Sequence, residues 1–171
     1  MDIKKWQIAG ALFTLILGTI LHFTYNWSGK NPVIGIFSAV NESIWEHLKL
    51  LAFPMLLFSA LEFLAYGKNL TNFVPVKMLS ILAGMLAIVV LFYTYTGIIG
   101  KNYFIADILI FVIGVFLSHF ISYRLLQTTL FSSCLMVIAG WLGLVGLVTL
   151  FALFTYAPPR LELFRDPLIQ N

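Results

Sequence analysis

Two carboxylates, an imidazole, an amide, a hydroxyl and an indole fall within the seven residues Asn41–His47, which read N-E-S-I-W-E-H. Imidazoles and carboxylates bind cations, and imidazoles exchange protons near neutral pH. Only 10% of the 171 residues are charged, and ionisable groups are expensive in apolar surroundings. The concentration of such groups in one segment therefore predicts a polar site.

Part of this segment also has a structural explanation. Ser43 and Glu46 have the S-x-x-E spacing of a capping box, in which the serine caps a helix and the glutamate reaches back to the cap amide. Trp45 is typical of a membrane-interface anchor. Capping does not explain His47, which stays a candidate for cation binding or proton relay.

The rest of the chain is apolar enough to need a membrane. Hydrophobic residues make up 61% of the sequence and the mean hydropathy is +0.98, far above the share in soluble domains. The sequence contains no run of Lys and Arg residues of the kind that would indicate a nucleic-acid partner. The single Cys134 excludes an intrachain disulfide and a cysteine zinc motif. We therefore predict one transmembrane domain over residues 1–171, with the lipid bilayer as its partner.

Apolar runs of about 20 residues are long enough to cross the bilayer as helices. They predict an all-α, polytopic membrane helix bundle of five transmembrane helices at residues 6–25, 44–66, 76–98, 103–123 and 130–156. The apolar piece at residues 33–37 is too short to span and predicts a re-entrant or interfacial segment. Prolines exclude a long helix in the tail, residues 157–171.

The parity of five spans places the first connection, the third connection and the tail on one side of the membrane. Five of the seven acidic residues and two of the three histidines fall on that side: His22, Glu42, Glu46, His47, Asp107, Glu162 and Asp166. Basic residues divide evenly between the sides, with Lys49 counted on this side and Lys77 on the other. Because Lys4 and Lys5 precede the first span, we predict a cytoplasmic N-terminus.

Ionisable residues at membrane depth usually face the bundle interior or a wet cavity. The candidate binding residues are therefore Glu42, Glu46, His47, Asp107 and His22. Three of them, His22, His47 and Asp107, are candidate ligands of a divalent metal. Glu62 and His119 lie toward the opposite membrane face, each alone, where a local ion pair is expected rather than a second site.

Small residues recur at helical spacing, as in Gly10, Thr14 and Gly18. Such seams let membrane helices approach closely. They predict packing within the bundle, with a homo-oligomer through one seam as the alternative.

Two sequence motifs of this chain are similar to motifs of a known protein family. With its N-E-S-x-W-E-H segment at Asn41–His47 and its P-P-x-x-x-L-F-x-D-P tail from Pro158 to Pro167, it resembles an uncharacterised family of small multi-span bacterial membrane proteins. The resemblance covers nearly the whole length and implies a bacterial inner membrane. It implies no activity, cofactor or substrate.

Three functions are compatible with these residues. The first is binding or transport of a cation, proton or small solute. The second is a structural or accessory membrane protein whose polar cluster only pins helices. The third is a membrane-embedded metal hydrolase, in which Glu46 or Glu42 would act as general base. No H-E-x-x-H motif, nucleophile elbow or phosphate loop occurs, so the sequence favours a non-enzymatic role.

Overall fold

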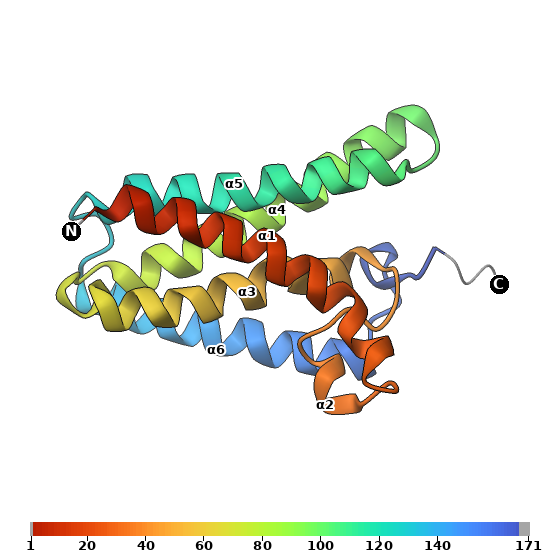
Figure 1. Cartoon of the computed structure of the whole chain (residues 1–171), viewed down its shortest axis with the longest axis horizontal. Helices are drawn as coiled ribbons and strands as arrows, with labels where there is room; N and C mark the ends of the chain where they lie inside the picture. The colour runs from red at the N-terminus through yellow and green to blue at the C-terminus, as the bar shows by residue number, and fades with distance from the viewer. Residues whose placement is uncertain (1, 168–171) are drawn as a thin grey trace.

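The computed structural model describes residues 2–167 and is built from five long helices and one short helix (Figure 1). The helices are α1 (Ile3–Trp27), α2 (Pro32–Gly35), α3 (Ile44–Ala65), α4 (Phe73–Ile99), α5 (Phe104–Leu126) and α6 (Cys134–Tyr156). All except α2 are long and apolar enough to cross a membrane. No strand occurs in the described part of the chain. The predicted all-α bundle with five spans is confirmed.

The helix ends follow local chemistry. Ser43 caps α3 by accepting a hydrogen bond from the Glu46 amide at 3.4 Å. The last helix begins later than predicted, at Cys134, because Phe131 adopts a left-handed conformation with φ of 65° that a helix cannot contain. In residues 157–167, the described part of the tail, the chain forms a single 3-10 turn, Glu162–Phe164, in agreement with its prolines.

The long helices alternate in direction along the bundle. In Figure 1 the start of α1 lies at one end, whereas α2, the α4–α5 turn and the Glu162–Phe164 turn lie at the other. This arrangement confirms the predicted parity, which brings the acidic connections and tail to one end. The apolar piece of the first connection forms the four-residue helix α2 with Pro32 in its first turn.

The glycine seam of α1 serves packing within the chain. Gly10, Thr14 and Gly18 are all buried. A Cβ on Gly18 would lie 2.3 Å from the Leu50 carbonyl oxygen of α3 and 2.9 Å from the Phe111 ring of α5. Glycine at this position therefore sets how closely α1 approaches the two helices that carry the polar residues.

A buried polar network lies toward the N-terminal end of α1. The Lys77 amino group of α4 binds the Glu62 carboxylate of α3, and both side chains are buried. The Gln7 amide oxygen accepts from Lys77 at 3.4 Å and contacts His119 Nδ1 at 3.1 Å. The expected local ion pair is confirmed, but Glu62 and His119 are not each alone, because Gln7 joins them. Burial beside Glu62 also raises the pKa of Tyr66 and keeps its hydroxyl protonated.

Lys49 and Lys77, counted above among the basic residues of the two sides, are buried in ion pairs inside the bundle. One further prediction is wrong. Trp45 is not an interface anchor. It is buried and packs against Phe151 and Phe164, so it joins α3 to α6 and the tail.

We predict that Lys77→Met destabilises the protein by about 3–5 kcal/mol, because it leaves the Glu62 carboxylate buried without its counter-charge. The double variant Glu62→Gln/Lys77→Met recovers most of that loss. Unfolding by sodium dodecyl sulfate in mixed micelles, followed by circular dichroism, measures both. The exposed Lys68→Met on the same end of the bundle is the control. Equal instability of the single and double variants would contradict this assignment.

Candidate functional site

The first connection is fastened to the end of α1 by Ser38, which is fully buried. Its hydroxyl donates to the Leu21 carbonyl and accepts from the Tyr25 amide at 3.0 Å. The Thr24 hydroxyl donates to the Ser38 hydroxyl oxygen at 3.0 Å. These bonds use backbone groups near the end of α1 and fix where the chain turns toward α3.

Lys49 fastens the same connection to α3 and α6. Its amino group donates to the carbonyls of Gly35 at 2.9 Å and Ser38 at 3.2 Å, and to the Thr155 hydroxyl at 2.7 Å. It also pairs with Glu46 at 2.6 Å, with side-chain exposures of 0% and 2%. A buried ammonium is stable only with its donors satisfied, so this arrangement fixes the connection rigidly.

Glu46 is therefore a positioning residue. Its carboxylate accepts from Lys49 and from the Val40 amide at 2.9 Å, and it does not line the cavity described below. The predicted hydrogen bond from the Ser43 backbone amide to the Glu46 carboxylate is wrong. The Ser43 amide donates instead to Asn41 Oδ1. The helix cap and the candidate site thus use different members of the Asn41–His47 segment.

The fixed connection places Glu42 between two histidines. His47 Nε2 lies 3.4 Å from one carboxylate oxygen of Glu42, and His22 Nε2 lies 3.9 Å from the other. The imidazole ring centroids are 5.2 Å apart. One ligand atom from each residue can be chosen so that all three lie within 4.8 Å of one another. We call His22, Glu42 and His47 the cation cluster.

The hydrogen bonds of His47 determine the character of this cluster. His47 Nδ1 lies 2.8 Å from the Ser43 carbonyl oxygen, which can only accept, so Nδ1 carries a proton. The other ring nitrogen faces the Glu42 carboxylate, which when ionised also only accepts. A lone pair on Nε2 would face the lone pairs of the carboxylate. A proton or a metal ion between the two atoms removes that conflict.

The cluster is accessible and Glu42 is ionised. Side-chain exposures are 28% for His22, 43% for Glu42 and 32% for His47. The hydrogen bond to His47 lowers the pKa of the Glu42 carboxyl, helped by the charges of both imidazoles and opposed by partial burial. The buried Nδ1 of His22 has no hydrogen-bond partner among the described residues, so no protein group fixes the tautomer of that ring.

The cluster opens into a cavity of about 940 Å³ between α1, α3, α4 and α5, with the tail beside it. Its charged, imidazole and amide lining residues are His22, Glu42, His47, Asn102, Asp107, Glu162 and Arg165, and hydroxyls come from Thr19 and Tyr93. The charged and amide groups come from helix ends and connections, whereas the deeper lining is mostly apolar, as at Leu50, Ile88 and Phe111. Thr19 also lies deeper, but its hydroxyl donates to the Leu15 carbonyl of its own helix. The cavity is thus polar at the end of the bundle and apolar within it.

Asp107, the third predicted metal ligand, lines the same cavity. Its carboxylate accepts from the Tyr95 hydroxyl and from the Asn102 amide at 3.4 Å, and its charge acts on His47. The two histidines are brought together as expected, but Glu42 rather than Asp107 stands between them. Asp107 therefore contributes a second carboxylate to the cavity wall.

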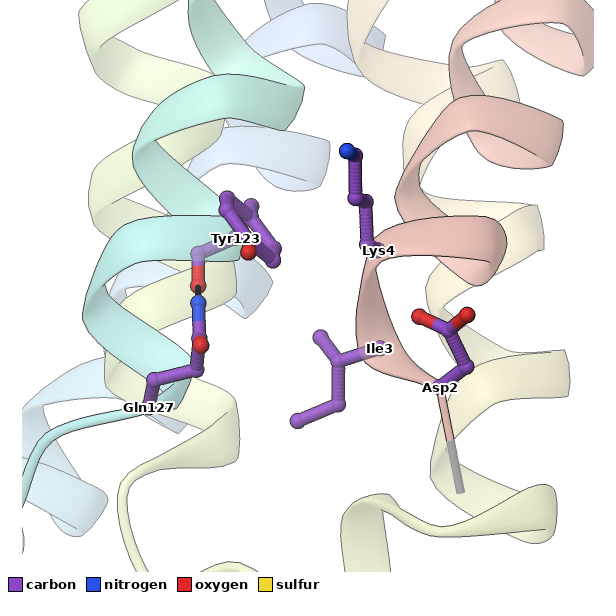
Figure 2. Close-up of a pocket in the computed structure, with 5 residues that line it drawn as sticks. All are labelled: Asp2, Ile3, Lys4, Tyr123 and Gln127. Carbon is purple, nitrogen blue, oxygen red and sulfur yellow. Dashed lines mark hydrogen bonds between the residues drawn. The ribbon is translucent and has the colours of Figure 1, made fainter.

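A smaller cavity of about 200 Å³ lies between the start of α1 and the end of α5. Figure 2 shows that the Gln127 side chain turns back to the Tyr123 carbonyl of its own helix, at 2.7 Å. The Lys4 and Asp2 side chains extend separately and do not point toward each other. This cavity brings no set of polar groups together, so the large cavity is the candidate site.

The positioning residues Ser38, Lys49 and Thr155 were missed by sequence reasoning. One signal was present, because Glu46 and Lys49 are opposite charges at i,i+3 in an apolar helix and such neighbours can pair. Nothing local marks Thr155, which lies 106 residues from Lys49. Ser38 stands in a short connection where a hydroxyl is unremarkable.

The fold and the site define a polytopic helical protein with a polar cluster and cavity at one end of an apolar bundle. The chain belongs to the family of unknown function DUF6512, whose model matches residues 1–170. Comparison with curated proteins finds no match. Comparison with solved structures finds none either.

We predict that Gly18→Ala disturbs the cluster, because the new Cβ would meet the Leu50 carbonyl and force α1 away from α3. A loss of about 1–3 kcal/mol in unfolding free energy is expected from overpacking. Gly97→Ala is the matched control. Gly97 lies in α4 with open space around it, so alanine there is expected to stabilise the helix by up to about 1 kcal/mol. Thermal unfolding in detergent micelles compares the two, and equal behaviour would contradict the packing role of Gly18.

Proposed function

We propose that this protein binds a cation, either a proton or a divalent metal ion, at His22, Glu42 and His47, and serves in binding or transport of that cation or of a small solute coupled to it. The observation that carries the proposal is the hydrogen bond from His47 Nδ1 to the Ser43 carbonyl. It leaves Nε2 facing an ionised carboxylate, so the geometry calls for a positive charge between them.

The spacing of the cluster also suits a metal ion. Ligand atoms of tetrahedral Zn²⁺ lie roughly 3.3–3.5 Å apart when each bond is about 2.0–2.1 Å. The separation of 3.4 Å between His47 and Glu42 fits this value, and the 3.9 Å between His22 and Glu42 is slightly longer. A metal-ligating histidine usually donates its other ring N–H to a carbonyl or carboxylate, as His47 does. Three protein ligands would leave one position for water or solute.

A purely structural role for the cluster is the alternative. Its three side chains are about one-third exposed, and exposed ion pairs contribute little to stability. The bundle is already held by the buried pairs Glu46–Lys49 and Glu62–Lys77. Because the buried pairs already hold the helices together, the exposed cluster is better explained by ligand binding than by a structural role. A metal hydrolase is less well supported, because Glu46 is engaged by Lys49 and does not reach the cavity.

We also propose a bacterial inner membrane as the setting, with a cytoplasmic N-terminus. Without the buried Lys49 and Lys77, four basic residues remain on each side: Lys4, Lys5, Lys68 and Arg124 against Lys30, Lys101, Arg160 and Arg165. The orientation therefore rests on Lys4 and Lys5, which precede the first helix. The cluster would then face away from the cytoplasm.

We expect close to stoichiometric Zn²⁺ on the purified protein after incubation with the metal and removal of the excess. His47→Ala and Glu42→Gln each lose it, because each removes one of three ligands. Asp2→Asn is the matched control, since Asp2 and Glu42 are carboxylates of similar exposure at opposite ends of α1 and its connection. Elemental analysis by mass spectrometry is the measurement. A wild type without metal leaves the proton as the bound cation, and retention of metal by both variants would contradict the site.

The pH dependence of Zn²⁺ binding gives a further test. The apparent affinity is expected to fall by about tenfold or more between about pH 7.5 and 5.5, because an imidazole nitrogen must lose its proton to bind metal and histidines titrate in this range. Glu42 stays ionised over this range, since its pKa is lowered. Titration calorimetry in two buffers of different ionisation enthalpy also counts the protons released. An affinity independent of pH would exclude the histidines as ligands.

A further inference from the structure

The cation cluster forms only one wall of the cavity, and the rest of that space is much larger than an ion needs. At about 940 Å³ it falls within the range of small-molecule sites, roughly 300–1,000 Å³. Five aromatic residues line it: Phe23, Phe92, Tyr93, Phe104 and Phe111. The charge, the aromatic content and the exposure of this lining restrict the kind of molecule that the cavity suits.

The charge of the lining favours a cation. Arg165 is paired with Glu162 at 3.3 Å, so this pair contributes no net charge. Glu42 and Asp107 remain, and of these Glu42 is shared with the two histidines. The hydrogen bonds on Asp107 come from the neutral Tyr95 hydroxyl and Asn102 amide, so neither donor brings a positive charge to this carboxylate. Away from bulk water, a carboxylate attracts a cation more strongly than it would in solution.

The aromatic walls favour the same sign of charge. Ring faces carry negative quadrupole potential and attract ammonium-type cations, most strongly when the cation is desolvated. They also pack well against an apolar ligand body. A cavity with a carboxylate at its polar end and aromatic side walls therefore suits a ligand with both a positive centre and apolar groups.

The exposed lining residues indicate the side from which a ligand would enter the cavity. Phe23 of α1 and Phe104 and Ile108 of α5 line the cavity and are at the same time exposed, at 45%, 77% and 45%. In a helix that spans a membrane, exposed apolar side chains face lipid. An entrance between α1 and α5 would thus admit molecules that already partition into the bilayer.

We infer that this cavity binds a hydrophobic organic cation, an ammonium or phosphonium with an apolar body, with its charge near Asp107 and its body against the aromatic walls. The inference goes beyond the proposed cation cluster, because Asp107 and the aromatic residues carry it and no metal is required.

Two probes of the same shape and opposite charge provide the test. Tetraphenylphosphonium and tetraphenylborate are titrated onto the full chain in lipid nanodiscs, and binding to empty nanodiscs is subtracted. We expect saturable binding of tetraphenylphosphonium, with tetraphenylborate at least about tenfold weaker because the carboxylates repel it. Equal binding of the two ions, or stronger binding of the borate, would show simple hydrophobic partition and overturn the inference.

Two variants locate the interaction. Asp107→Asn keeps a carbonyl to accept from Tyr95 but loses the charge, and is expected to weaken tetraphenylphosphonium binding about tenfold. Phe23→Leu removes one ring and is expected to weaken it about two- to fivefold. Phe120→Leu is the control, since Phe120 is an exposed residue of α5 outside the cavity. Unchanged affinity in Asp107→Asn, with folding verified by circular dichroism, would place the cation elsewhere.

The outcomes separate this inference from the proposed function. Zn²⁺ and tetraphenylphosphonium are titrated independently onto the wild-type protein. Metal binding without phosphonium binding would overturn the organic-cation site and leave the cation cluster standing. Phosphonium binding without metal binding would overturn the metal form of the cation cluster and leave the organic-cation site standing.

Discussion

The buried ion pair between Lys49 and Glu46 is the interaction on which the candidate site depends. An ammonium and a carboxylate inside an apolar bundle are tolerated only when every donor and acceptor is used. Lys49 meets that demand by binding two carbonyls of the first connection and a hydroxyl of α6. Satisfying one buried charge therefore fixes a connection that would otherwise be a free loop, and with it the position of Glu42.

Polar residues have two distinct roles in this bundle, and exposure tells them apart. The pairs Glu46–Lys49 and Glu62–Lys77 are fully enclosed and tie three or more helices and connections together. The cluster of His22, Glu42 and His47 is about one-third exposed and borders a large cavity. Enclosed charges hold the fold in place, whereas accessible ones can exchange protons, ions or ligands.

Much of the architecture could be predicted from the sequence, because apolar runs of membrane length permit only helices and their parity fixes which connections meet. That reasoning brought His22, His47 and Asp107 to one end of the bundle. It could not choose between Asp107 and Glu42 as the partner of the histidines, since side-chain position near a connection depends on tertiary contacts. Glu46 was misread for the same reason. Its capping spacing is real, but its carboxylate pairs with Lys49 one turn later, because an unpaired buried ammonium would be costly. The Ser43 amide that the glutamate would have bound is satisfied by Asn41 instead.

Under the two proposals, Glu42 belongs to both the cation cluster and the wall of the aromatic cavity. A carboxylate that is neutralised by a proton or metal ion between the histidines attracts an organic cation less strongly. Binding at one place therefore weakens binding at the other, and linkage requires the effect to be reciprocal. Because Asp107 keeps its own charge, the organic cation would be weakened rather than excluded. Such negative coupling between two cations, with one held at the polar end and one in the apolar cavity, is the thermodynamic condition for exchanging one for the other.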